Sequence, residues 1–321
     1  MFNARLKCLI AMFVPLLFFT PPPLEAEDKL ITPYGSLRPE VIARFPESGD
    51  QVRRMDDGYS RVGIKGNAVL TETLTGFYKY ERRVSANDGQ DDGAVRSDNN
   101  ELRQIYAGLK GDFGSFSIGR HYGLYYDYID DEIDRHKSHY SDAIIFGDLF
   151  VSNSLLYQSP QIGLFNFGVL VELNDADAQG NTIDERVEVA ATFRYQDFAL
   201  HAGYVNAPTH DGLFGAAASY KFNAITIAGV YQKFQFANNQ DQSLLSLAVD
   251  TDLTPRNHLR LAATSTQIDS NKNLEAVVIL AGADHKFSDH FLAYIEFFNR
   301  TSEVTQPGDE SALITGFRFD F

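Results

Sequence analysis

The feature that most constrains this chain is an alternation of apolar and polar residues with a period of two. It is clear in 185–195, where two sets of residues occupy alternate positions: Val187, Val189, Ala191, Phe193 and Tyr195 against Glu188, Ala190, Thr192 and Arg194. Successive side chains of a β-strand point to opposite faces, so this run predicts a strand with one apolar and one more polar face. The alternation favours an all-β fold.

Runs of this kind recur through the chain, each about 9 to 13 residues long and ended by Gly, Asn, Asp or Pro. There are about sixteen, a number of strands at which a closed barrel keeps an aqueous channel instead of a packed core. Short connections and longer polar ones roughly alternate, which is typical of the turns and loops of a transmembrane antiparallel β-barrel. The predicted strands are 32–45, 59–69, 73–84, 101–112, 114–122, 151–158, 163–174, 185–196, 198–206, 212–222, 225–235, 242–252, 257–268, 273–286, 290–301 and 310–321.

The first residues have the pattern of a secretory signal peptide. Arg5 and Lys7 precede an apolar stretch that is too short to span a membrane as a helix, and Leu24-Glu25-Ala26 supplies a small residue for cleavage. We expect a signal peptide over 1–26 and a barrel domain over 27–321. The only cysteine, Cys8, falls in the signal peptide, so disulfides would not stabilise the exported chain.

The charge of the chain argues against nucleic acid as a partner. The formal net charge is −15, and it becomes −16 when Arg5, Lys7 and Glu25 are removed with the signal peptide. The mean hydropathy of −0.23 agrees with a barrel, because its lipid-facing and water-facing residues cancel in an average.

The last predicted strand ends in an aromatic residue. Leu313, Thr315, Phe317 and Phe319 share one face with the terminal Phe321. This pattern resembles the signal that the outer-membrane barrel assembly machinery reads on its substrates. We therefore expect Phe321 to act as an assembly signal, and outer-membrane lipid and lipopolysaccharide to surround the barrel.

One connection, 123–150, is much too long for a turn, and we call it the constriction loop. It carries Asp130, Asp131, Glu132 and Asp134, together with apolar residues such as Ile129 and Ile133. Long ordered loops of this kind are usually functional. The apolar residues indicate that the loop packs inside the barrel and narrows the channel. The alternative is an extracellular loop with a solvated acidic face.

Several motifs resemble those of the Gram-negative general diffusion porins, which are trimeric and sixteen-stranded. The matching stretches are Gly58-Tyr59-Ser60-Arg61-Val62-Gly63-Ile64-Lys65-Gly66, Arg103 with Tyr106-Ala107-Gly108-Leu109-Lys110, Phe113-Gly114-Ser115-Phe116, Gly119-Arg120, Tyr122-Gly123 and Tyr140-Ser141-Asp142. The resemblance implies an outer-membrane channel for passive diffusion of small hydrophilic solutes and ions, with no cofactor. It also implies an inward-folded third loop whose carboxylates (Asp130, Asp131, Glu132 and Asp134) face a wall of basic residues.

Arg61 and Arg103 match the basic wall positions of this family. Arg61 is also placed inward by the alternation of its strand, whereas Arg103 shares parity with Ile105 and requires either a bulge or a subunit contact. Ser36 stands where some family members have a lysine, and Lys79, Arg83 and Arg38 are candidates to replace the missing charge. Surface salt bridges are the alternative role of these three.

The family resemblance also implies a homotrimer, in which the loop 85–100 and Arg120 contact a neighbouring subunit. For ion preference we expect mild cation selectivity, because carboxylates are in excess.

Two other functions remain open. A solute-specific porin could use the tyrosines at 122–128 as an aromatic track, and a barrel hydrolase would need a nucleophile beside a base. The eight histidines are scattered and show no metal-ligand spacing that stands out, so we expect no catalytic or metal site.

Overall fold

The computed structural model describes residues 28–47, 49–85, 102–173, 186–207, 210–235, 241–268, 276–302 and 308–321. The predicted signal peptide, the loop 85–100 from Ala86 onward and parts of several other long connections lie outside the described residues. No helix among the described residues is both long enough and apolar enough to cross a membrane.

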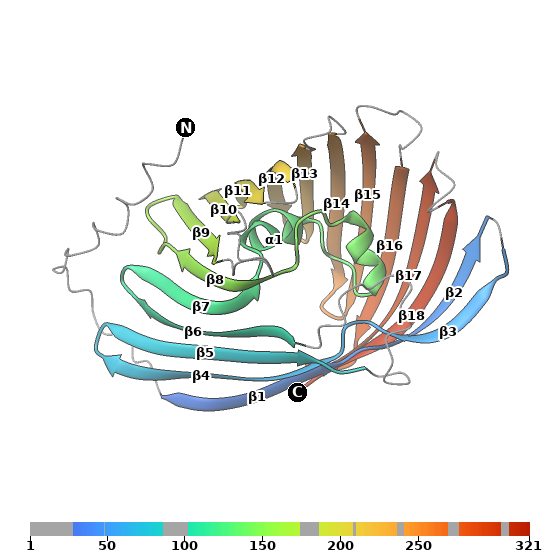
Figure 1. Ribbon diagram of the computed structural model, residues 1–321. Helices are drawn as coiled ribbons and strands as arrows, with labels where there is room; N and C mark the ends of the chain where they lie inside the picture. Colours follow the sequence, from blue (N-terminus) through green and yellow to red (C-terminus); the bar gives the residue numbers. More distant parts are fainter. Residues whose placement is uncertain are drawn as a thin grey trace, which may run out of the picture.

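The described residues form one antiparallel sheet of eighteen strand segments that closes on itself (Figure 1). The segments are β1 (Lys29–Leu37), β2 (Pro39–Pro46), β3 (Val52–Asp57), β4 (Arg61–Thr71), β5 (Leu74–Arg83), β6 (Leu102–Gly111), β7 (Gly114–Tyr122), β8 (Phe150–Gln158), β9 (Phe165–Glu172), β10 (Val187–Tyr195), β11 (Phe198–Ala207), β12 (His210–Phe222), β13 (Ile225–Gln235), β14 (Gln242–Thr254), β15 (Asn257–Ile268), β16 (Ala276–Lys286), β17 (Phe291–Ser302) and β18 (Glu310–Asp320).

Two barrel strands are each broken into two segments, which reconciles eighteen segments with sixteen strands. β1 and β2 are separated at Arg38: β1 pairs mainly with β4, and β2 pairs with β3 and β18. β3 and β4 are likewise separated by 58–60. Counting each broken strand once gives the closed sixteen-stranded barrel that the sequence predicts.

The sequence prediction missed β3 and began the second strand at residue 59. The segment contains Arg53, Arg54, Asp56 and Asp57, a composition that strands usually avoid, so no apolar alternation marks it. Its stability comes from pairing with β2 and from ion pairs such as the one between Arg54 and Asp56, 2.8 Å apart.

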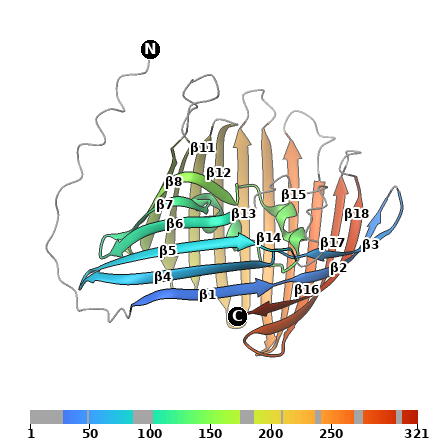
Figure 2. The same ribbon diagram turned by 60° about the horizontal axis from the view of Figure 1, so that its bottom comes forward.

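The two ends of the barrel differ. Short connections at 72–73, 112–113, 223–224 and 255–256 lie at one end of the barrel, which we call the turn end, and the opposite strand ends, from which the constriction loop starts, form the loop end (Figure 2). Apolar side chains on the outer face are exposed in the isolated chain, including Val62, Ile64 and Leu245. This outer apolar face is what a barrel presents to lipid.

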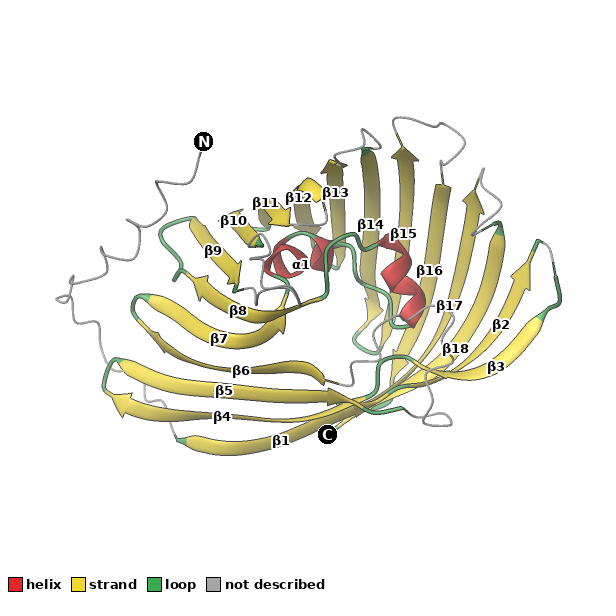
Figure 3. Ribbon diagram, in the orientation of Figure 1, coloured by secondary structure: helices red, strands yellow, loops and turns green. Residues whose placement is uncertain are grey.

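The constriction loop folds into the barrel (Figure 3), where its apolar residues join the buried cluster formed by the wall. It contains α1 (Leu124–Tyr128) and two 3₁₀ helices, η2 (Asp130–Glu132) and η3 (His139–Ile144). The fully buried side chains of Ile129, Ile133 and Ile144 pack in one cluster with inward residues of the wall, including Leu213 and Val230. The apolar residues of the loop therefore serve to hold it inside the lumen.

Two wall glycines allow this close packing. A Cβ atom at Gly215 would lie 2.1 Å from the Tyr125 hydroxyl, and one at Gly203 would lie 3.0 Å from Ile129. The helix α1 can approach β11 and β12 only because these positions carry no side chain.

Candidate pore constriction

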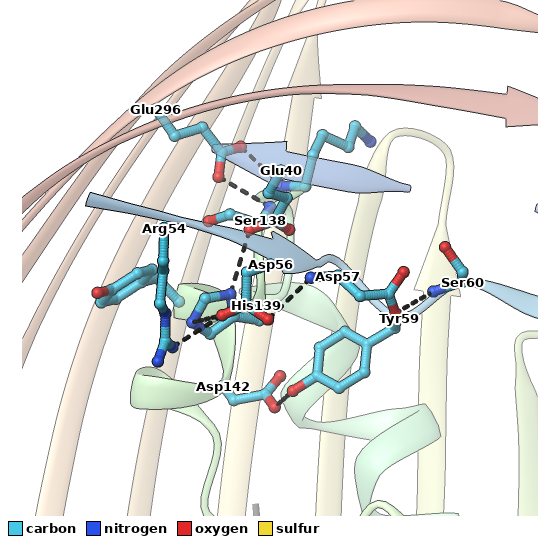
Figure 4. Close-up of polar contacts among 12 residues, drawn as sticks. Glu40, Arg54, Asp56, Asp57, Tyr59, Ser60, Ser138, His139, Asp142 and Glu296 are labelled. Carbon is cyan, nitrogen blue, oxygen red and sulfur yellow. Dashed lines mark hydrogen bonds and ion pairs between the residues drawn. The ribbon is translucent and has the colours of Figure 1, made fainter. Parts of the chain in front are cut away.

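The middle of the constriction loop, residues 137–139, is bound to the barrel wall by polar contacts. The backbone N–H groups of Lys137 and Ser138 donate to the two carboxylate oxygens of Glu296 on β17, at 2.7 and 2.9 Å. His139 Nδ1 lies 3.1 Å from a Glu40 carboxylate oxygen, and its Nε2 lies 4.0 Å from Asp56 (Figure 4). The loop thus reaches from the end of β7 to β2, β3 and β17.

A second contact binds the later part of the constriction loop, in η3, to the barrel wall. The Tyr59 hydroxyl donates to the Asp142 carboxylate, which points toward it in Figure 4. Burial, reinforced by the charge of Glu40, raises the pKa of Asp142 to about 7. Tyr59 adopts a left-handed backbone conformation with φ of 69°, in the break between β3 and β4. The break therefore places a tyrosine where it can bind the loop.

Between the loop and the opposite wall lies an opening of about 260 Å³. Its basic residues come mainly from the wall, and its acidic residues come from the loop. The lining side chains are Arg38, Arg61, Arg103, Lys137 and Arg318, with Asp131, Asp134 and Asp142, and with Tyr59, Tyr122, Tyr126, His136, Ser138, Ser141, Leu149 and Tyr294.

The four predicted loop carboxylates do not share one role. Asp131 and Asp134 line the opening, and Asp134 accepts a hydrogen bond of 2.6 Å from the Tyr126 hydroxyl. Asp130 is fully buried and accepts from the Gly147 N–H and the Gln232 side-chain amide. Asp130 therefore stabilises the loop and does not face the opening.

Glu132 points to the far wall, where its carboxylate lies 3.1 Å from His201 Nε2 and 3.1 Å from Arg135 Nη2. Burial raises the pKa of Glu132, but the hydrogen bond and charge of His201 and the charge of Arg135 outweigh it, so the pKa is lowered overall. This carboxylate is charged and already paired, away from the opening.

The basic wall is organised around one buried carboxylate, Glu81. Its oxygens lie 2.7 Å from Arg103 Nε, 3.8 Å from Arg61 Nε and 3.7 Å from Lys79 Nζ. The Tyr34 hydroxyl also donates to it, at 3.0 Å. One negative charge is therefore shared by three cations, which orients them and leaves the wall positive.

Arg103 reaches the lumen through a β-bulge. Glu81 pairs with Gln104 and Arg82 with Leu102, so Arg103 is skipped in the register between β5 and β6. The Arg103 and Gln104 side chains are consequently both buried, at 8% and 2% exposed. Of the two explanations that the sequence leaves open for its parity, the structure contains the bulge.

The remaining predicted wall residues lie at different positions. Arg38 lines the opening, and its Nε donates to the Ser36 hydroxyl at 2.8 Å. Arg83 Nε lies 3.9 Å from Asp57, and Lys79 lines a separate cavity nearer the turn end.

Arg120, the predicted subunit contact, makes several contacts within the chain. Its guanidinium donates to the carbonyls of Leu102 and Arg103 and to the Ser152 hydroxyl, at 3.1, 3.2 and 2.5 Å. Phe321, the predicted assembly signal, continues β18 and exchanges backbone hydrogen bonds with Gly35.

Sequence reasoning missed Arg318, Lys137 and Asp142 as lining residues. A signal was present for Arg318, which alternates with Phe317 and Phe319 on the polar face of the last strand. No pattern marks Lys137, because its place depends on where Glu296 holds the loop.

Comparisons with known proteins agree with this architecture. A family model described as Gram-negative porin matches residues 16–303. The chain belongs to the Gram-negative porin family. This porin is an outer-membrane β-barrel.

Its curated relatives include the outer membrane porin protein OmpD of Citrobacter koseri, 30% identical over 57% of this chain and 53% of the relative. Another is outer membrane protein S2 of Salmonella typhi, 43% identical over 25% of this chain and 20% of that protein. The alignment with OmpD therefore spans about half the length of that relative.

Solved structures show the same fold at low identity. Salmonella typhi OmpF, solved in complex with daunomycin, superimposes with a TM-score of 0.74 at 18% identity, covering 91% of this chain and 97% of that one. The anion-selective porin from Comamonas acidovorans gives a TM-score of 0.73 at 15% identity, covering 92% of this chain and all of that one.

Proposed function

We propose that this porin forms a water-filled channel for passive diffusion of small hydrophilic solutes and ions, which it selects by size and charge. The observation that carries the proposal is the opening between the loop carboxylates Asp131 and Asp134 and the wall arginines Arg38, Arg61 and Arg103. It lies inside a closed barrel that is too wide for wall side chains alone to fill.

The geometry gives this opening a transverse electric field. Negative side chains on the loop face positive ones on the wall, in a narrow aqueous space bounded by protein of low dielectric constant. Polar solutes that fit can align in this field, and cations and anions follow separate sides. Passage needs no tight binding, because a solute must leave as easily as it enters.

The proposal includes the assembled form of the porin. Family resemblance supports a homotrimer, with Arg120 near a subunit contact, and one solved neighbour, OmpT of Vibrio cholerae, is described as a trimer form. Lipid and lipopolysaccharide around the apolar outer face, and recognition of Phe321 by the barrel assembly machinery, belong to the same proposal. We assign no cofactor and no catalytic role.

Planar-bilayer recording of the purified chain tests this function. We expect stable single-channel conductance that increases with bulk salt, and liposome swelling in small neutral sugars that falls as the sugar becomes larger. Membrane insertion without steady conductance would contradict the proposal.

A solute-specific porin is the second candidate, and one observation favours it. Tyr122 stacks on Tyr126 and on Phe150, with ring centroids 5.4 and 4.7 Å apart, beside the opening. Saturable block of the current by one neutral sugar would support this candidate, whereas equal behaviour of sugars of equal size supports general diffusion. Hydrolysis of lipid or peptide by the purified chain would instead support the barrel hydrolase.

A further inference from the structure

A cavity of about 750 Å³ lies against the barrel wall on the turn-end side of the constriction. Four lysines, Lys29, Lys65, Lys79 and Lys110, line this cavity, which we call the lysine chamber. The strand register places it: Arg61 pairs with Arg83 near the constriction, and Lys65 pairs with Lys79 four residues further toward the turn. A solute that passes the wall arginines therefore reaches the lysines next.

The register of β4 and β5 brings like charges together. Lys65 is directly opposite Lys79, and Arg61 is directly opposite Arg83, on the lumen face of the same strand pair. Like charges in such cross-strand positions destabilise a sheet. Each of these two like-charged pairs is unfavourable for the stability of the sheet. Unfavourable local arrangements of this kind are expected at functional sites.

The lysines have few anionic partners. Glu81 lies 3.7 Å from Lys79 but is shared with Arg61 and Arg103. Within the described ranges, no carboxylate lies within ion-pair distance of Lys29, Lys65 or Lys110; the Lys65 ammonium instead lies 5.3 Å from the Tyr34 ring centroid. Their positive charge is thus available to ions in the lumen.

Among the residues that the structure describes, the only carboxylate that lines the lysine chamber is Asp127, on α1 of the constriction loop. Burial, reinforced by the nearby charges of Asp131 and Glu188, raises the pKa of Asp127 to about 7. Of the described residues, five basic side chains and three carboxylates line the constriction itself. Both parts of the path therefore carry more positive than negative side chains.

We propose that the wall arginines and the lysine chamber form one continuous path that makes this channel prefer small inorganic and carboxylate anions over cations. The inference rests on the proposed channel function and names its preferred solute class. The preference is opposite to the one expected from the net charge of the chain, because an ion in the lumen responds most strongly to the charges that line it.

The reversal potential of the full-length channel in planar bilayers, under a KCl gradient and then a potassium malonate gradient, tests the inference. We expect an anion-to-cation permeability ratio above one that rises as salt is diluted, since screening weakens. A conducting channel that prefers potassium would overturn the inference alone. Absence of conductance would overturn the proposed function and the inference with it.

Substitutions of the chamber lysines test whether these residues cause the anion preference. Lys65→Gln combined with Lys79→Gln should lower the chloride-to-potassium permeability ratio by about threefold, because two unit charges leave the path. Lys65→Gln and Lys110→Gln, each alone, should lower it less and report on the chamber if the double variant fails to assemble.

The matched control is Lys233→Gln, which removes one charge on β13 from the position next to the buried, lumen-facing Gln232. Lys233 lies 3.3 Å from Asp241 near the loop end and does not line the chamber. An equal fall of the ratio in this control, or no change in any chamber variant, would overturn the inference.

Discussion

Glu296 offers the sharpest test of how the constriction loop is held. Its fully buried carboxylate accepts the N–H groups of Lys137 and Ser138, and Arg260 Nη2 lies 3.6 Å away. Hydrogen bonds to a charged group contribute about 1.5 to 3 kcal/mol each. Glu296→Ala removes both acceptors, so the docked loop end should lose about 3 to 6 kcal/mol relative to the released one.

A loss of this size raises the ratio of released to docked loop by about two to four powers of ten. Ile129 and Ile133 remain packed against the wall, so the release should be confined to the part of the loop that follows them. Glu296→Gln keeps one acceptor oxygen and should lose about half as much.

Single-channel recording detects the release as open-channel current noise and as closure at lower voltage. We expect both effects to increase from the wild type to Glu296→Gln and then to Glu296→Ala. Asp252→Asn is the control, because this carboxylate is 64% exposed and lies beside His258, near the turn end of β14. Noise and closing voltage in Glu296→Ala equal to those of the wild type would refute the docking role of Glu296.

Three further predictions address the wall, the oligomer and the titrating carboxylates. Gly215→Val should destabilise the barrel by about 1 to 3 kcal/mol in urea unfolding, because the new side chain meets Tyr125; Gly229→Val, whose Cβ would meet only Ser246 O at 3.8 Å, should not. Arg120→Ala should lower the temperature at which the oligomer dissociates on unheated gels, and an unchanged melting profile would argue against its role at a subunit contact. Asp127 and Asp142, both with a pKa of about 7, lose negative charge as the pH falls from 8 to 6, so the anion preference should rise. Asp127→Asn should reduce this pH dependence of the reversal potential. An anion preference that decreases when the pH is lowered from 8 to 6 would contradict the prediction.

The sequence predicts the barrel well because each strand carries its own pattern. Alternation is local, and burial on one face and lipid on the other maintain it over whole strands, as in β10 and β18. It fails at β3, where Arg53, Arg54, Asp56 and Asp57 line up without an apolar face.

The constriction is only partly predictable, since its geometry depends on contacts between distant residues. Asp130 and Glu132 look equivalent to Asp131 in the sequence. In the structure, however, Asp130 accepts a hydrogen bond from Gln232, 102 positions away, and Glu132 pairs with His201, 69 positions away. The lysine chamber is similarly invisible, because it appears only when the register between β4 and β5 is known.

The bulge at Arg103 has a consequence for how such a channel can evolve. Arg120 binds the carbonyls of Leu102 and Arg103, and so fixes the backbone at the point where the strand changes its parity. Deleting Leu102 would place Arg103 opposite Arg82, on the lipid-facing side, without altering any charged residue. Gain or loss of a single codon, and not only substitution, can therefore switch a pore charge on or off.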